Sequence, residues 1–146
     1  MQTKNTLRRA GVLVSFLVLA AMMALPALAK TPNAKTKRPT VAIIRADWCT
    51  ACQKLEPTMM ELMNQYKDRI DFVMLDVTDD QKAAKSAATA RKLGIGKFFH
   101  ENMKNTSTVV VLSPAHKILF RTAKNFDREA YVKAFDEAIA QSGHRS

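Results

Sequence analysis

The sequence predicts an α/β domain in which a central mixed β-sheet carries helices on both faces. From residue 40 onwards, short β-branched apolar runs alternate with amphipathic segments of helical periodicity. Two further apolar runs near the C-terminus are joined by only four residues, which favours an antiparallel hairpin. The 146 residues and the 47% hydrophobic content suit one domain. The predicted order is β-α-β-α-β-β-α, with right-handed crossovers that cover both faces.

The first 29 residues have the pattern of a signal peptide. Three cationic residues precede an apolar run over residues 10–25, and Pro26 and an Ala-Leu-Ala sequence follow it. An uncleaved membrane anchor is the alternative, because about 20 residues suffice to cross a bilayer as a helix. Both interpretations predict a periplasmic or secreted protein. If the segment is an uncleaved anchor, the protein would also be attached to the membrane.

Residues 30–39 are predicted to form a basic linker before a domain that spans residues 40–146. The linker holds four cationic residues, two prolines and no apolar run. The leader carries three cations and no acidic residue, so the formal charge of +10 falls to +7 without it. The remaining cations are scattered among acidic residues with no aromatic cluster, which argues against nucleic-acid binding.

The domain begins with a predicted strand over residues 40–46, whose sequence TVAIIRA is typical of a strand buried on both faces. Both cysteines follow at once. A helix is then expected over residues 52–69, kinked by Pro57. Its apolar side chains recur at helical spacing, namely Leu55, Met59, Leu62, Met63 and Tyr66.

A second strand is expected over residues 70–80, and it ends in a Thr/Asp sequence able to cap the next helix. That helix is expected over residues 81–93, ended by Gly94. The segment 94–105 is ambiguous between a short helix and a loop-like insertion. Its two adjacent aromatic residues, Phe98 and Phe99, belong either to the core or to a specificity surface.

The C-terminal part predicts a hairpin and a last helix. The strands TVVVL and KILFR, residues 108–112 and 117–121, flank the connection SPAH. The last helix begins after Asp127 as N-cap. Its apolar stripe consists of Ala130, Tyr131, Ala134, Phe135, Ala138 and Ile139.

The only two cysteines, Cys49 and Cys52, allow three interpretations. A structural disulfide between residues three apart closes so short a loop that it adds only about 2 kcal/mol. A metal site normally needs four ligands, and the dispersed histidines offer no second half-site. A redox pair explains the position better, because the pair stands where a buried strand leads into a helix.

The start of that helix is predicted to activate Cys49. Unpaired backbone N–H groups and the helix dipole favour an anion there, so the pKa of Cys49 should be lowered and its thiolate should act as nucleophile. Cys52, one turn further on, should be more buried and protonated, and it would resolve a mixed disulfide by attacking the Cys49 sulfur.

The sequence WCTAC and Pro57, five residues after the second cysteine, resemble the thioredoxin superfamily over residues 40–139. The resemblance implies a thioredoxin fold and places Trp48 over the disulfide. ADWCTAC, the later DVTDD and Glu56 look most like the C-terminal thioredoxin-like domain of periplasmic DsbD. That resemblance implies a reductant of exported thiol proteins.

Two departures from the family pattern affect the chemistry. A buried aspartate and its lysine partner, which assist proton transfer in the family, are replaced by Ile43 and Met74. Their loss would leave Cys52 in an apolar pocket that disfavours its thiolate. Glu56, one turn past Cys52, is our hypothesis for a substitute proton acceptor. A solvated glutamate on a helix surface is the equally weighted alternative.

The second departure concerns the family's cis-proline, whose place Ser107 takes. Because a cis bond before a residue other than proline costs about 2.5–4 kcal/mol, the Thr106–Ser107 bond is predicted to be trans. The resemblance assigns a substrate groove to Thr106, Ser107 and Thr108. Loss of the proline also strengthens the metal alternative, since the family's proline helps to keep metals from the cysteines. The insertion 96–105 could lie beside the groove.

Methionine thioethers are soft ligands that suit copper(I). Met59, Met60, Met63 and Met103, with His100 nearby in sequence, therefore form a minor candidate copper site. Methionines at helical spacing more often fill a core. His116 and His144 are expected to be exposed.

Together these observations predict an exported thiol-disulfide oxidoreductase that needs no dissociable cofactor and acts as a monomer. Its predicted partners are exported thiol or disulfide proteins and a membrane electron donor. Thr50 and Ala51, between the cysteines, would help to set the reduction potential, and the DsbD-like features favour a reductant. The alternative is a thioredoxin-fold copper carrier or binding module with little exchange activity.

Overall fold

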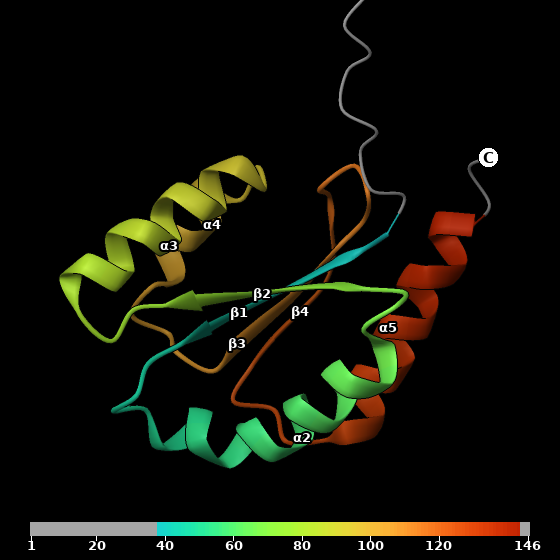
Figure 1. Cartoon of the computed structure of the whole chain (residues 1–146), viewed down its shortest axis with the longest axis horizontal. Coiled ribbons are helices and arrows are strands. Elements are labelled where there is room, and N and C mark those ends of the chain that lie inside the picture. The colour runs from blue at the N-terminus through green and yellow to red at the C-terminus, as the bar shows by residue number, and fades with distance from the viewer. Residues whose placement is uncertain (1–37, 144–146) are drawn as a thin grey trace, which may run out of the picture. The chain divides into compact units, whose positions relative to one another are not determined.

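The computed structural model describes residues 38–143, which contain one four-stranded mixed sheet (Figure 1). Its strand order is β2-β1-β3-β4. The two inner strands are β1 (Thr40–Arg45) and β3 (Thr108–Leu112), which pair antiparallel. β2 (Asp71–Asp76) lies parallel to β1, and β4 (Ile118–Ala123) pairs antiparallel with β3. The predicted mixed sheet and C-terminal hairpin are confirmed.

The inner strands are buried on both faces, as their sequences predict. All five residues of β3 are buried, and in β1 only Arg45 is partly exposed. β4 instead alternates between exposed and half-buried residues, as expected for a strand at the edge of a sheet. The β-branched sequences of β1 and β3 therefore form the centre of the sheet, and the site lies just beyond the end of β1.

Two helices cover each face of the sheet (Figure 1). α2 (Thr50–Tyr66) and α5 (Arg128–Gly143) pack on one face, and α3 (Asp80–Lys92) and α4 (Gly96–Asn102) pack on the other. α2 begins two residues earlier than predicted, because Cys49 serves as its N-cap. The ambiguous segment 94–105 contains the short helix α4.

The side chains of β1 alternate between two buried clusters. Val41 and Ile43 face α2 and α5, where T-shaped aromatic contacts join Phe135 to Tyr66 and Phe72. Ala42 and Ile44 belong to the cluster on the other face, which also holds both cysteines and the α4 aromatics. Phe98 is 9% exposed and Phe99 is 2% exposed. The suggestion that they form a specificity surface is therefore wrong, and they are core residues.

The predicted helix boundaries rest on identifiable contacts. The Asp79 side chain caps α3 by accepting a hydrogen bond from the Lys82 N–H at 2.8 Å. Gly94, just beyond that helix, adopts a φ of 71°, which few other residues tolerate. Asp127 accepts a hydrogen bond from the Glu129 N–H at 3.0 Å and so caps α5. These three contacts confirm the predicted helix signals.

The predicted leader, most of the basic linker and His144 lie outside the described residues. Within residues 38–143, no helix combines the length and apolar character needed to cross a bilayer.

Candidate active site

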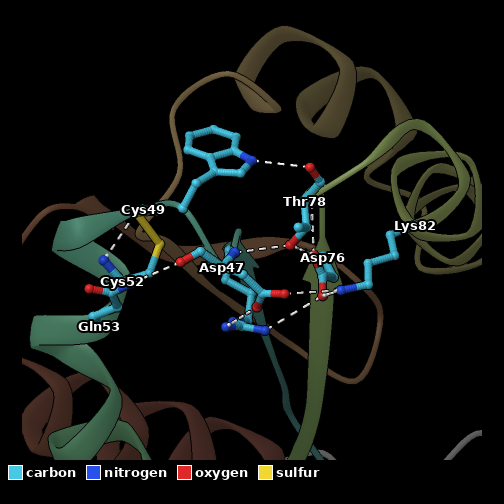
Figure 2. A network of polar contacts seen from close by, with 9 residues as sticks. Asp47, Cys49, Cys52, Gln53, Asp76, Thr78 and Lys82 are labelled. Atoms are coloured by element: carbon cyan, nitrogen blue, oxygen red, sulfur yellow. Dashed lines mark hydrogen bonds and ion pairs between the residues drawn. A yellow bond between two sulfur atoms is a disulfide. The ribbon is translucent and has the colours of Figure 1, made fainter.

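Cys49 and Cys52 form a disulfide at the start of α2, with their Cα atoms 5.2 Å apart (Figure 2). Cys49 is the N-cap residue, with extended backbone angles of φ −89° and ψ 104°. Its Sγ accepts a hydrogen bond from the Cys52 N–H, with a nitrogen–sulfur distance of 3.0 Å. The Cys49 sulfur therefore occupies the position at which a helix N-terminus stabilises a negative charge.

The two cysteines are equally buried, which corrects the expected difference between them. Cys49 is 6% exposed and Cys52 is 7% exposed. Both pack in the buried cluster that includes Ile44 and Ala46. The disulfide joins the two sulfurs, and both cysteines share the same surroundings in this structure. The N-cap hydrogen bond, and not burial, therefore distinguishes the predicted nucleophile, Cys49, from the predicted resolving residue, Cys52.

A network of four charged side chains lies beside the cysteine loop (Figure 2). Asp47 accepts from Arg45 at 2.8 Å and from Lys82 at 3.2 Å. Asp76 lies 3.2 Å from Lys82 and 3.5 Å from Arg45. The network ties together the end of β1, the loop before Cys49, the end of β2 and the first turn of α3. It therefore holds the loop in a fixed position relative to the sheet.

The same contacts set the direction of three pKa values. Hydrogen bonds from Lys82 and Arg45 lower the pKa of Asp47. Burial raises the pKa of Asp76, but hydrogen bonds from Thr78 and Lys82 outweigh it, so the net pKa is lowered. Hydrogen bonds to Asp47 and Asp76 raise the pKa of Lys82. All three groups are therefore charged around neutral pH, and their charges compensate one another.

Thr78 connects this network to Trp48. The Thr78 hydroxyl accepts from the Asp47 N–H at 2.9 Å and donates to Asp76. The Trp48 indole N–H donates to the Thr78 carbonyl at 3.1 Å, and the side chain is 61% exposed. The predicted role of Trp48 in covering the disulfide stays a prediction.

The sequence offered only a weak signal for this network. The DVTDD segment predicts a helix cap, and Asp79 does cap α3. The roles of Asp76 and Thr78 depend on the parallel pairing of β2 with β1, which brings Arg45 opposite Asp76. A contact between side chains 31 residues apart cannot be read from local periodicity.

Other predicted supporting residues lie on the first turns of α2. Thr50 is exposed and Ala51 is half-buried, so the residues between the cysteines lie at or near the surface. Pro57 lies inside α2, where it supplies no N–H to the preceding turn. The Gln53 side chain donates to the Asp47 carbonyl at 2.9 Å and fastens the helix start to the loop.

Cys52 borders a cavity of about 180 Å³ on the α2 side of the sheet. Ile43 and Met74 both border it, and they are register partners on β1 and β2. Ile43 and Met74, which the family resemblance aligns with the aspartate and the lysine, therefore lie side by side. This is the arrangement expected of two positions that hold an interacting pair in the family. The full lining comprises Ile43, Arg45, Cys52, Leu55, Glu56, Met59, Met60, Met63, Met74 and Ser107.

Glu56 is exposed and borders the same cavity as Cys52. Its proposed role as proton acceptor therefore has a route through a shared cavity, and it stays a hypothesis.

The methionines do not group as the sequence suggested. Met103 and His100 border a different hollow, on α3 and α4, and are separate from the cavity at Cys52. Met74 takes the place of Met103 beside Met59, Met60 and Met63. No cluster of three or more His, Cys, Asp or Glu side chains suited to a metal occurs among residues 38–143. His116 is exposed at the hairpin turn, as predicted.

The predicted groove residues Thr106, Ser107 and Thr108 are all at most 6% exposed. The Thr106–Ser107 bond is trans, as predicted, since the described part of the chain holds no cis peptide. Ser107 borders the cavity with a left-handed φ of 63°. The assignment of these three residues to a substrate groove stays a prediction. Because their side chains are buried, a substrate would contact their backbone and the cavity instead.

Comparison with known proteins agrees with this geometry. A model of the Thioredoxin family matches residues 30–113, more than half of the chain. The thioredoxin-like protein HCF164, chloroplastic, of Oryza sativa is 50% identical over 40 residues, which make up 27% of this chain and 15% of that protein. The thiol:disulfide interchange protein TxlA homolog of Synechocystis is 36% identical over 76 residues, or 52% of this chain and 41% of that protein.

The matches therefore span well under half the length of these curated relatives. A solved structure, that of a putative protein disulfide isomerase from Bacteroides thetaiotaomicron, superposes with a TM-score of 0.53 at 17% identity. It covers 75% of this chain and 79% of its own, and it supports the thioredoxin fold. With its mixed sheet, its flanking helices and a CxxC pair at the start of α2, the chain belongs to the thioredoxin family.

Proposed function

We propose that this protein is an exported thiol-disulfide oxidoreductase that exchanges disulfides with other exported proteins. One observation carries the proposal: the Cys49 sulfur caps α2, accepts the Cys52 N–H and is joined to the Cys52 sulfur. A pair placed in this way has a stabilised leaving group in Cys49 and a resolving thiol within bonding distance. The curated relatives named as thioredoxin-like and thiol:disulfide interchange proteins support the same chemistry.

The reaction proceeds in two exchanges and conserves its electrons. In the reduced protein, the Cys49 thiolate attacks one sulfur of a substrate disulfide, forms a mixed disulfide and releases the first substrate thiolate. Cys52 loses its proton and attacks the Cys49 sulfur, so that the disulfide seen here forms and the second substrate thiolate leaves. Counted from the dithiol, the protein loses two electrons and two protons and the substrate gains the same number, because Cys49 released its proton when its thiolate formed. No dissociable cofactor takes part.

The finer features of the proposal come from the sequence. The apparent leader at residues 1–29 supports export to the periplasm or beyond. The DsbD-like stretch ADWCTAC, with Glu56, supports a reductant that accepts electrons from a membrane donor and acts as a monomer. The reduction potential of the Cys49–Cys52 couple, measured against glutathione, tests whether the protein acts as a reductant or as an oxidant. A value near that of thioredoxin, about −270 mV, fits a reductant, whereas a value near −120 mV fits an oxidant.

Insulin reduction with dithiothreitol as electron source tests the activity itself. The wild-type protein should accelerate precipitation of the insulin B chain, and Cys49→Ser should abolish the acceleration. Cys52→Ser should also abolish turnover but should accumulate a mixed disulfide through Cys49. Wild-type protein that reduces neither insulin nor a small disulfide would refute the proposal.

A second candidate function, copper(I) binding, is favoured by the cavity at Cys52. Four methionines border that cavity with Cys52, and thiolate and thioether are the ligands that select copper(I). Met60 is 57% exposed and Met74 is 45% exposed, so filling of the core does not explain these two.

Titration of the reduced protein with copper(I) against a chromogenic chelator separates the candidates. A copper carrier should bind one ion tightly without reducing insulin. Replacing both Met60 and Met74 by leucine should weaken binding, while Met103→Leu, outside the cavity, should leave it unchanged. Equal affinities of all these proteins would refute a thioether site.

A further inference from the structure

Ser107 carries the one buried side-chain polar atom that lacks a hydrogen-bond partner among residues 38–143. The residue is 0% exposed. Buried hydroxyl groups are almost always paired, because an unpaired one loses its hydrogen bonds to water without replacement. Other buried hydroxyls follow the rule: Thr108 donates to the Asn105 carbonyl, and Ser86 donates to the Asp76 carbonyl. The unpaired Ser107 hydroxyl therefore calls for an explanation.

The backbone of Ser107 is held in an unfavourable conformation. Its φ of 63° lies in the left-handed region, which costs a serine about 1 kcal/mol or more. Two hydrogen bonds fix it there, because its N–H donates to the Ile44 carbonyl at 2.8 Å and its carbonyl accepts from the Lys124 N–H at 2.9 Å. The residue is thus clamped between β1 and the end of β4, and strain of this kind is commonly kept where it serves a function.

Ser107 borders the same cavity as Cys52. Of the ten residues around that cavity, only Arg45 on β1 and Glu56 on α2 carry a charge. The Arg45 guanidinium is engaged by Asp47 and Asp76, and Glu56 is exposed at the rim. Ile43 and Met74 offer no polar group. The Ser107 hydroxyl is therefore the one buried donor of the cavity wall that is free of other partners within the described residues.

We propose that the Ser107 hydroxyl donates a hydrogen bond to the Cys52 sulfur once the disulfide is open. This inference rests on the proposed exchange reaction and assigns a positioning role within it. Opening the disulfide transfers two electrons from the electron donor to the two cysteines, and a negative charge then forms on the Cys52 sulfur whenever its thiol loses a proton. The hydroxyl stabilises that charge but takes no proton. In the mixed disulfide between Cys49 and a substrate, the Cys52 thiol loses its proton to a separate base, and the thiolate attacks the Cys49 sulfur and displaces the substrate thiolate.

The proposal explains why the hydroxyl has no partner in this structure. The sulfur of a disulfide carries no charge and is a weak acceptor, whereas a thiolate accepts hydrogen bonds strongly. The oxidised pair seen here therefore leaves the donor without its partner. The proposed hydrogen bond from Ser107 also gives the cavity a polar contact at Cys52, although the aspartate–lysine pair of the family is absent.

The test follows the alkylation of Cys52 by iodoacetamide against pH. A full-length Cys49→Ser parent leaves Cys52 as the only thiol, and Ser107→Ala and Ser107→Gly are added to it separately. Each variant should shift the alkylation midpoint upward by about one pH unit, which slows alkylation at neutral pH about tenfold. Alanine keeps the strained backbone and glycine relieves it, so equal shifts assign the effect to the hydroxyl and not to the strain.

Ser113→Ala is the matched control. Ser113 is also buried, at 4% exposed, but its oxygen is paired with the Lys117 N–H beyond the far end of β3. The Ser113→Ala substitution should leave the alkylation midpoint of Cys52 unchanged. The proposal would be overturned if both Ser107 variants had the same alkylation midpoint as the Cys49→Ser parent. A shift in the glycine variant alone would overturn it too. Because alkylation requires no exchange partner, failure here is distinguishable from failure of wild-type protein to reduce insulin.

Discussion

Ile43 on β1 and Met74 on β2 are register partners in the parallel part of the sheet, and both border the cavity that reaches Cys52. The thioredoxin-like pattern has an aspartate and a lysine at these positions. This chain carries apolar side chains at both positions, which are neighbours on adjacent strands. Proton transfer at Cys52 must therefore use other groups, and the remaining polar residues around the cavity are few.

Restoring the polar pair should reveal their coupling. Ile43→Asp alone should lower the free energy of unfolding at pH 7 by about 3 kcal/mol, because Ile43 is only 3% exposed and an unpaired carboxylate there is poorly solvated. Adding Met74→Lys should recover about 1 kcal/mol or more. Urea unfolding of the two single variants and the double variant gives the coupling energy. Strictly additive effects would show that the two side chains do not meet.

Glu56→Gln tests the substitute proton acceptor. If Glu56 accepts the Cys52 proton through the cavity, the variant should slow insulin reduction and change its dependence on pH. Glu137→Gln, on the exposed face of α5, provides a control with the same change in charge. A Glu56→Gln profile that overlays the wild-type profile would assign the residue to the solvated surface of α2.

The carboxylate of Asp76 should contribute a pH-dependent part of the stability. Its folded-state pKa is lowered, since hydrogen bonds from Thr78 and Lys82 outweigh the effect of burial. A lowered pKa stabilises the fold above the unfolded value of about 3.9, and this contribution is lost as pH falls through the folded-state pKa. Asp76→Asn should therefore cost about 1 kcal/mol at pH 7, and the cost should decrease as pH falls through the folded-state pKa of Asp76.

Urea unfolding at several pH values measures that difference, and Asp68→Asn, at an exposed position of the same charge, is the control. A cost for Asp76→Asn that stays constant across the pH range would show that packing and not charge is responsible.

Trp48 is the only tryptophan, so its fluorescence reports on the cysteine loop. If its indole covers the disulfide as the family resemblance implies, reduction of Cys49–Cys52 should increase the emission, because disulfides quench a nearby indole. Thr78→Gly should remove the hydroxyl that holds the Asp47 N–H and should loosen the loop. In that variant, reduction of the disulfide should change the Trp48 emission less than it does in the wild-type protein. Emission that is insensitive to reduction in the wild-type protein would place the indole away from the sulfurs.

Local patterns in the sequence were sufficient for most of the fold. The β-branched runs of β1 and β3 require burial on both faces, and Asp79, Gly94 and Asp127 mark helix ends through their own backbone contacts. Helix α4 stayed ambiguous because seven residues give too few turns for a periodic signal. Its aromatic pair is buried because α4 packs beside α3 on the sheet, which is a tertiary arrangement.

The site was predictable in its sulfur chemistry but not in its supporting contacts. The position of Cys49 at a helix start follows from the position of the pair after a buried strand, whereas its role as N-cap became visible only in the structure. The network of Asp47, Asp76 and Lys82 and the cavity that joins Met74 to Cys52 require strand register. The nearly equal burial of the two cysteines, joined in a disulfide, is a tertiary property that no local sequence pattern specifies.

Alkylation of Cys49 against pH, in a full-length Cys52→Ser variant, tests the central claim most directly. The helix start that offers the residue-52 N–H to the Cys49 sulfur should stabilise its thiolate. We expect a midpoint at least one pH unit below the value of about 8.5 for an ordinary thiol. A midpoint at about 8.5 would show that the helix start does not activate Cys49, and the proposed exchange mechanism would lose its nucleophile.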